Sequence, residues 1–418
     1  MRYIRRWAET QFDLAGTIFK AIAFTGPRQC GKTTLMKKVL PKEGAFVSLD
    51  LASNREFANS EPSGFLMQYE KFPCLAIDEV QKAPVLFSEI KAFVDQKPQM
   101  RQYLLSGSSN YKAMPTVNES MAGRLGEIRL RPLSEGEIEG KAPRFIDRVL
   151  EGNFSFDIEK GSCNRTEILR KAIRGGFPQI LDRTREERTF WFDAYVDALV
   201  NQDLLEIKEV RRPAQLRKLL GLCVANSSRL LNVLTLSRNL DLSRLTLNTY
   251  LDLLETMFLI ERIPAWKPRK GERIGTTPKC LVCDTGLMSH LLGINQERAF
   301  TNPYDKAQSD LLGNIMETWV YEQLVSLTDA SRDWKLFHFR NHSGIEVDFI
   351  LENRAGDLIA IEVKASEIVK SEHFKNLRWF KDAFGKTHQV RCVVLYCGSD
   401  VRHFAEDAVA LPMTALFS

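Results

Sequence analysis

The residue types best suited to chemistry come early in the chain, in the pattern G-x-x-x-x-G-K-[ST]. The pattern is filled by Gly26, Pro27, Arg28, Gln29, Cys30, Gly31, Lys32 and Thr33. Glycines let backbone N–H groups curl around a phosphate at a helix N-terminus, where the helix dipole favours anions. The Lys32 ammonium would reach the β- and γ-phosphates, and the Thr33 hydroxyl would ligate Mg²⁺. A β-rich run at residues 21–25 and a helical run from Thr34 give this phosphate loop the strand–loop–helix setting it requires.

An acidic pair predicts the second half of the same site. The apolar run 74–77 ends in Asp78 and Glu79. We expect Asp78 to hold Mg²⁺ through water, and Glu79 to polarise an attacking water as general base. The pair implies hydrolysis of a bound nucleotide rather than binding alone.

Two further residues are candidates for this site. Ser108 follows the strand-like run 103–106 and could sense a γ-phosphate, the alternative being an ordinary polar loop. Arg124 could neutralise charge in the transition state, in its own chain or across a subunit boundary. The alternative for Arg124 is a surface arginine without a catalytic role.

A second group of chemical residues lies near the end of the chain. Asp348 stands in the run 346–351, and Glu362 and Lys364 follow at the end of the run 358–363. A turn at residues 353–356 would let the two runs pair as a hairpin, bringing Asp348 beside Glu362, and strand alternation places Glu362 and Lys364 on one face. Two carboxylates that hold Mg²⁺, with a lysine to orient the nucleophile, suit phosphodiester cleavage. An alternating charged strand surface gives the same letters and is the alternative.

The surrounding sequence predicts the elements that must position these residues. Strand-like runs at 21–25, 45–50, 74–78, 103–106 and 127–130 alternate with amphipathic stretches, as in a parallel sheet covered by helices. From about 160 to 300 the apolar spacing is helical, as in 189–205 and 245–260. The last part has predicted helices at 311–327 and 374–384 and strands at 334–339, 346–351, 358–363 and 390–396. We therefore predict an α/β chain with domains at 1–140, 141–302 and 303–418.

A basic segment in the middle region makes DNA a candidate partner. Residues 264–279 hold five basic residues and one acidic residue. They follow a predicted helix, 242–259, whose start resembles that of a winged-helix recognition helix. A basic hairpin after such a helix could track phosphates, with Lys267, Arg269 and Lys270 as contacts. A solvated basic loop is the alternative.

Several motifs together resemble a family of prokaryotic AAA-type ATPases, relatives of the AAA+ proteins. They are the phosphate loop, Asp78-Glu79, residues 105–109 and residues 122–124 followed by 131–134. The resemblance extends over most of the chain, including residues 175–178 and 284–287. It implies an N-terminal P-loop sheet, ATP and Mg²⁺ as cofactors, and a second copy or another protein as partner.

The C-terminal pattern resembles the PD-(D/E)xK nuclease superfamily, although Val347 stands where the name of the superfamily has proline. That resemblance adds Glu317, on the helix before the first strand, as a third metal-binding acid beside Asp348 and Glu362. It implies a restriction-endonuclease-like domain, and the simplest hypothesis for coupling is that the nucleotide state positions this domain on DNA for cleavage. The rival hypothesis is an inactive domain of this fold that docks nucleic acid or protein.

Composition bounds these hypotheses. The chain has 418 residues, 44% hydrophobic, with a net charge of +5. A single small module and a disordered chain are excluded, and the mild charge does not decide for or against nucleic acid. No apolar run approaches a membrane span and the basic start lacks a signal-type apolar core. We therefore expect a cytoplasmic protein without a membrane partner.

Overall fold

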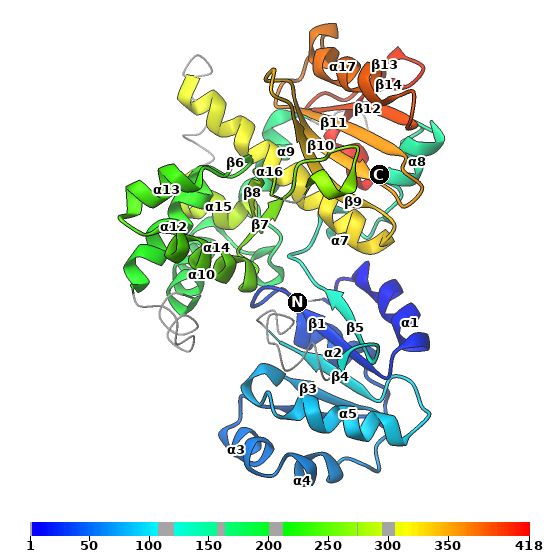
Figure 1. The fold of residues 1–418 in the computed structure, drawn as a ribbon, viewed down its shortest axis with the longest axis vertical. Helices are drawn as coiled ribbons and strands as arrows, with labels where there is room; N and C mark the ends of the chain where they lie inside the picture. Colours follow the sequence, from blue (N-terminus) through cyan, green and yellow to red (C-terminus); the bar gives the residue numbers. More distant parts are fainter. Residues whose placement is uncertain (1, 108–120, 157–163, 200–211, 274, 295–305) are drawn as a thin grey trace. The chain divides into compact units, whose positions relative to one another are not determined.

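The computed structural model describes residues 2–107, 121–156, 164–199, 212–273, 275–294 and 306–418 (Figure 1). By its internal contacts the chain divides into two compact units. The first comprises Arg2–Leu133 with Thr256–Phe258, and the second comprises Ser134–Glu255 with Leu259–Ser418. We call them the N-terminal unit and the C-terminal unit, and each is described by itself.

The N-terminal unit is built on a parallel sheet of five strands in the order β2-β3-β4-β1-β5. The strands are β1 (Ala21–Thr25), β2 (Ala45–Ser48), β3 (Leu75–Asp78), β4 (Tyr103–Ser106) and β5 (Leu125–Arg129). Helices α1 (Ala8–Ile18), α2 (Lys32–Val39), α3 (Ala52–Ser60), α4 (Pro62–Met67) and α5 (Leu86–Gln96) surround it (Figure 1).

Both faces of this sheet are buried, as its continuous apolar strands predict. Alternate residues of β1 enter two separate cores: Ala21 and Ala23 pack with residues of α3, α4 and α5. Ile22 and Phe24 pack with residues of α1 and α2. The α/β class and the parallel N-terminal sheet expected from the sequence are confirmed.

The first half of the C-terminal unit is helical, with a small antiparallel sheet in the order β6-β8-β7. Its elements are α7 (Glu135–Ile138), α8 (Phe145–Glu151), α9 (Arg165–Arg174), α10 (Arg185–Ala198), α12 (Pro213–Ala225), β6 (Arg229–Leu230), α13 (Val233–Leu240), α14 (Arg244–Thr256), β7 (Ile260–Ile263), β8 (Lys279–Val282) and α15 (Thr285–Leu291). The expected helix 245–260 thus ends early, and Ile260 begins a strand.

The second half carries a mixed sheet of six strands in the order β13-β14-β12-β11-β10-β9. Its elements are α16 (Lys306–Ser331), β9 (Lys335–Arg340), β10 (Glu346–Glu352), β11 (Leu358–Lys364), α17 (Lys375–Phe384), β12 (Val390–Tyr396), β13 (Arg402–Ala405) and β14 (Ala408–Pro412). Helix α17 packs its apolar face on this sheet, and α16 contacts β9 and β11. The sequence pattern does not predict β13 and β14.

The segment between β7 and β8 is part of the C-terminal core. The Trp266 side chain is fully buried and packs among sheet residues and α17, and its indole N–H donates to Glu352 Oε1 at 3.3 Å. Arg273 forms two hydrogen bonds to the same carboxylate, at 2.5 and 2.8 Å. Trp266, in the basic segment 264–279, is therefore a core residue, because a large aromatic side chain gains more from burial than from contact with solvent, and the DNA-contacting hairpin stays a prediction.

Among the described helices, none is long and apolar enough to cross a membrane.

Candidate nucleotide site and carboxylate cluster

The phosphate loop joins the end of β1 to the start of α2, and its first glycine is sterically required. Gly26 has φ 144°, and a Cβ there would lie 2.0 Å from the carbonyl oxygen of Leu130. Within the loop, Pro27 and Cys30 are buried, Arg28 is half-buried and Gln29 is exposed. Gly31 is the N-cap of α2, and Thr34, in the first turn of that helix, is exposed.

The Lys32 ammonium is held inside the loop by neutral groups. It is 5% exposed and donates to the carbonyl oxygens of Gly26 at 2.9 Å and Pro27 at 2.7 Å. Oxygens of a bound phosphate could replace these carbonyls as acceptors for the ammonium. The geometry therefore suits a lysine that changes partners when an anion binds.

Thr33 and Asp78 face each other across the loop. The Thr33 hydroxyl lies 3.0 Å from both carboxylate oxygens of Asp78, and the Ser106 hydroxyl at the end of β4 also donates to this carboxylate. Hydroxyl and carboxylate oxygens are the donors that Mg²⁺ prefers. These residues therefore fit Mg²⁺, with Ser106 fixing the orientation of Asp78.

Glu79 follows Asp78 in a left-handed backbone conformation, at φ 57°. This turn ends β3, and the Glu79 carboxylate accepts a hydrogen bond from the amide of Gln81. The side chain is half-buried. A carboxylate held in this way, directly after the Asp78 carboxylate, is placed to act on a water near the loop.

Arg6 also contacts the phosphate loop, although it belongs to none of the sequence motifs. Its guanidinium is buried and donates to the carbonyl oxygens of Cys30 at 2.9 Å and Arg131 at 2.7 Å. It therefore ties the phosphate loop to the chain after β5. Its position in a basic run at the start of the chain gave no signal of this contact.

Of the two remaining candidates, Ser108 lies outside the described residues, and Arg124 does not join this group. Arg124 comes just before β5, beside the start of β1, since its carbonyl accepts from the Ala21 N–H. Its guanidinium pairs with both oxygens of Asp95 at 2.7 and 2.8 Å. The loop follows the other end of β1, roughly 15 Å away at about 3.3 Å per residue, so Arg124 does not reach it in the same chain.

The predicted C-terminal hairpin is present. Strands β10 and β11 pair antiparallel, with Phe349 opposite Ile361, so that Asp348 and Glu362 fall at the next position. Asp348 Oδ2 accepts from the Val363 N–H at 2.9 Å. Lys364 Nζ donates to Glu362 Oε1 at 2.7 Å, as the alternation of the strand predicts.

Four acids, Glu317, Glu346, Asp348 and Glu362, form what we call the carboxylate cluster. Lys279 is the cation beside it. The Lys279 ammonium lies 2.5 Å from Glu317 Oε1, 3.5 Å from Glu346 Oε1 and 3.8 Å from Asp348 Oδ1. Burial and the Asp348 carboxylate raise the pKa of Glu317 to about 7 and that of Glu362 to about 8. Both shifts reflect crowding of negative charge away from water.

The carboxylate cluster does not fit the expected metal site. Within the described ranges, no group of three or more His, Cys, Asp and Glu side chains is arranged to hold a metal ion. An ammonium occupies the midst of the acids instead, since Lys279 has only 1% of its side chain exposed. Glu317 and Asp348 thus lie around Lys279, the last residue of the basic segment 264–279, while Glu362 pairs with Lys364 beside them.

The middle motifs have a structural explanation. The Asp284 carboxylate caps α15 through the Leu287 N–H at 2.8 Å and accepts from the Gly176 N–H at 2.7 Å. Gly175 has φ 76°, and a Cβ there would lie 2.6 Å from Asp284 Oδ1. Complete burial raises the pKa of Asp284 to about 6. These residues therefore join α9 to α15 by close backbone approach.

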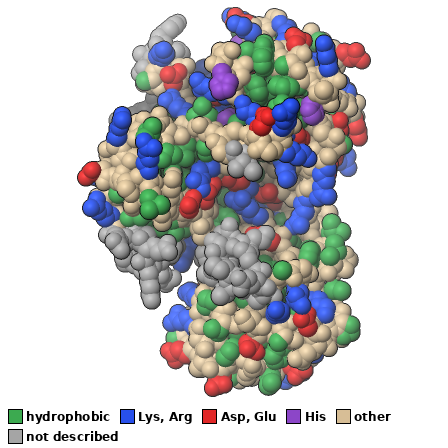
Figure 2. Space-filling view, in the orientation of Figure 1, with side chains coloured by type: hydrophobic (Ala, Val, Ile, Leu, Met, Phe, Trp, Pro, Cys, Tyr) green, Lys and Arg blue, Asp and Glu red, His purple; other side chains and the backbone are tan. Residues whose placement is uncertain are grey.

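The candidate nucleic-acid contacts differ in exposure. Arg269 has 85% of its side chain exposed, Lys270 is exposed and Lys267 is half-buried. On the face of the molecule that Figure 2 shows, Lys and Arg side chains are interspersed with Asp and Glu side chains. The structure thus leaves the DNA contact a prediction.

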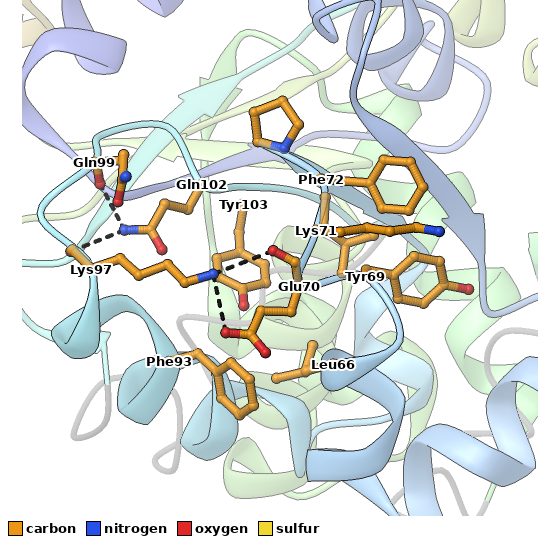
Figure 3. Close-up of a pocket in the computed structure, with 12 residues that line it drawn as sticks. Leu66, Tyr69, Glu70, Lys71, Phe72, Phe93, Lys97, Gln99, Gln102 and Tyr103 are labelled. Carbon is orange, nitrogen blue, oxygen red and sulfur yellow. Dashed lines mark hydrogen bonds and ion pairs between the residues drawn. The ribbon is translucent and has the colours of Figure 1, made fainter.

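A cavity of about 300 Å³ lies at the opposite edge of the N-terminal sheet from the phosphate loop. Figure 3 shows the rings of Tyr69, Phe72, Phe93 and Tyr103 around it, with Lys97 paired to Glu70. It adjoins Leu75 and Tyr103, the first residues of β3 and β4. Burial raises the pKa of Tyr103 to about 12. The cavity is thus separate from the candidate nucleotide site.

Comparison with protein families assigns the N-terminal part of the chain. Residues 19–139 match the family described as AAA domain. Together with the loop geometry and the parallel sheet, this match makes the region a P-loop domain of the AAA type. Residues 165–298 and 312–416 match two families that are each described as a domain of unknown function.

Two relatives in sequence are named as uncharacterized proteins. The chain is 26% identical over 393 residues to the uncharacterized protein Rv2008c of Mycobacterium tuberculosis, covering 94% of this chain and 79% of that protein. An uncharacterized protein of Haemophilus influenzae is 24% identical over 290 residues, covering 68% of this chain and 64% of the relative.

Comparison with solved structures gives matches with low TM-scores, including the following two. The Saccharomyces cerevisiae Hsp104–ADP complex has 15% identity and a TM-score of 0.30, over 79% of this chain and 46% of Hsp104. The Thermococcus gammatolerans McrB AAA+ hexamer complex with McrC has 12% identity and a TM-score of 0.23, over 81% of this chain and 91% of that chain. TM-scores this low do not establish a common fold along the whole chain.

Proposed function

We propose that the chain binds and hydrolyses ATP with Mg²⁺ and acts as a nucleotide switch. The observation that carries the proposal is the pairing of Thr33 with Asp78 at 3.0 Å, beside a Lys32 ammonium held by neutral carbonyls. When bound, Mg²⁺ held by Thr33 and Asp78 would neutralise charge on the phosphates.

The chain's own groups supply the other roles. Lys32 moves from the carbonyls to the phosphates, and the N–H groups of the loop and of the start of α2 surround them. Glu79 accepts the proton of the attacking water as general base. Ser106 holds Asp78 in place, and Arg6 holds the loop.

Steady-state ATP hydrolysis by the full chain tests this proposal. Lys32→Ala should lower kcat/KM by about 10²-fold or more, since one charged donor to the transition state is lost. Lys42→Ala, at an exposed lysine shortly after α2, is the matched control and should keep the wild-type rate. Equal hydrolysis by wild type and Lys32→Ala would contradict the proposal.

For the C-terminal unit, we propose docking of nucleic acid or a protein partner rather than cleavage of DNA. Supporting this choice, Lys279 lies among the acids that a cleaving site would use to hold metal. A second copy of the chain is a further proposed partner, and it would give Arg124 a route to a neighbouring nucleotide.

A supercoiled plasmid incubated with Mg²⁺ or Mn²⁺ distinguishes docking from cleavage. We expect no nicking that depends on Asp348, while filter binding measures docking of DNA. Nicking by wild type that is lost in both Asp348→Ala and Lys364→Ala would restore the nuclease hypothesis.

A further inference from the structure

Lys279 is a cation in a place where lysines are rarely found. It is 0% exposed and opens strand β8, where it pairs with Ile263 of β7. Burial opposes its charge, and the carboxylates of Glu317, Glu346 and Asp348 around its Nζ compensate for the lost hydration.

The carboxylates around it come from elements distant in sequence. Glu317 belongs to α16 and Glu346 and Asp348 to β10, and each has an oxygen within 4 Å of Lys279 Nζ. A buried ammonium is tolerated only where opposite charge and hydrogen bonds replace its hydration. The cluster and the lysine thus depend on each other.

A divalent ion would compete for the same oxygens. Mg²⁺ and Mn²⁺ need carboxylate oxygens at about 2.0–2.3 Å, and an ion bound to both Glu317 and Asp348 would lie close to the ammonium. Two positive charges at such a distance repel strongly in a poorly hydrated site. Lysine and metal therefore exclude each other.

The cluster nevertheless keeps unused capacity for a cation. Glu362 is 8% exposed, and while Glu362 Oε1 accepts from Lys364, Glu362 Oε2 is buried without a hydrogen-bond partner in the described part of the chain. Bound to a divalent ion in place of a proton, this oxygen would lose no existing hydrogen bond.

We propose that Lys279 is the resident cation of the carboxylate cluster and stands where a divalent ion would otherwise be held. The wild-type chain then takes no Mg²⁺ or Mn²⁺ at these acids, and removal of the ammonium creates a divalent-cation site. This inference goes beyond the proposed ATP switch and does not depend on it.

Manganese binding to the full chain without nucleotide tests the inference, with free Mn²⁺ counted by electron paramagnetic resonance. Ions at the cluster are those that disappear on Asp348→Asn, so ions at the phosphate loop do not interfere. Wild type and Asp348→Asn should bind alike. Lys279→Met should gain one ion per chain, at least tenfold tighter than any Asp348-dependent site of wild type, and lose it in the double variant Lys279→Met/Asp348→Asn. Lys335→Met, at an exposed strand lysine, should gain none.

The comparison of wild type with Asp348→Asn can overturn the proposal without any other variant. If wild type binds an ion that Asp348→Asn removes, with the affinity of Lys279→Met, then Lys279 does not stand in for a metal. If Lys279→Met fails to fold, as shown by near-ultraviolet circular dichroism, the comparison of wild type with Asp348→Asn still decides. ATP hydrolysis in the same preparations separates this outcome from failure of the proposed switch.

Discussion

Two lysines of this chain belong to sites that also hold carboxylates, but their immediate partners differ. Lys32 in the phosphate loop donates to two neutral carbonyls, whereas Lys279 faces three carboxylates. The first can exchange its partners for a phosphate, while the second is already neutralised. The charge of the partner, rather than the presence of a lysine beside acids, separates a ligand-binding lysine from a structural one.

If the phosphate loop is the reactive region, removal of its base should affect rate and not folding. Glu79→Gln keeps the Gln81 contact within reach but cannot accept a proton. We expect kcat for ATP hydrolysis to fall by about 10²–10⁴-fold, with ATP affinity retained, as measured by single-turnover hydrolysis and equilibrium binding. Loss of binding together with hydrolysis would instead give Glu79 a structural role.

If the carboxylate cluster is structural, removal of its lysine should affect folding and not ATP hydrolysis. Lys279→Met leaves buried carboxylates without their cation, which costs about 3–5 kcal/mol. Urea unfolding of the full chain should report this loss in the transition of the C-terminal unit. The double variant Lys279→Met/Glu317→Leu should be less destabilised than Lys279→Met, and Lys335→Met should match wild type. An unchanged transition in Lys279→Met would remove the contrast between the two sites.

Within the N-terminal unit, Ser106 is expected to support the reactive site through its hydrogen bond to Asp78. Its hydroxyl donates to Asp78, so Ser106→Ala should loosen that carboxylate and cost about 1–2 kcal/mol of interaction. We expect roughly a tenfold fall in kcat/KM for ATP hydrolysis. Ser60→Ala, at an exposed serine of α3, provides the control. A smaller effect than that of Ser60→Ala would show that Asp78 needs no such support.

The smallest expected effect is a change in stability with pH that comes from Glu362 of the carboxylate cluster. Folding raises the pKa of Glu362 from 4.5 to about 8, so between these values the folded state binds more protons than the unfolded state. The stability contributed by this group is therefore present below pH 4.5 and is lost as pH rises towards 8. Glu362→Gln should gain stability relative to wild type over this interval.

Thermal unfolding of wild type and Glu362→Gln at pH 5 and pH 8 measures this difference in stability. The midpoint of Glu362→Gln minus that of wild type should be larger at pH 8. Glu406→Gln, at an exposed position, should show no such trend. A difference that shrinks with rising pH would mean that the Glu362 carboxylate is stabilised in its charged form.

Local spacing made much of the N-terminal site predictable. The loop residues, Asp78 and the strands that carry them follow from runs of a few neighbouring residues. The hairpin of Asp348 and Glu362 was predictable for the same reason, because a short turn fixes the register. Ser106 escaped notice because its hydroxyl reaches Asp78 on the neighbouring strand, whereas the search favoured Ser108.

The role of Lys279 could not be predicted from its surroundings in the sequence. It lies 38 residues before Glu317, to which it donates, and only the packing of β8 against α16 and β10 brings them together. In the sequence it was one more positive charge of a basic segment, as was Arg273. Long-range pairing of charges leaves no periodic pattern, whereas strands and helices do.

The burial of Trp266 in the core of the six-stranded sheet determines where the chain can be divided into stable fragments. Three residues that precede the six-stranded sheet in the sequence contribute to the domain that contains it. They are this tryptophan, Arg273, which pairs with Glu352, and Lys279, which pairs with Glu317. A fragment that began at residue 303 would contain the sheet but would lack the core side chain of Trp266 and the Lys279 ammonium. The two regions that match separate families therefore share one core, and a fragment that begins at residue 303 should unfold more readily than the full chain.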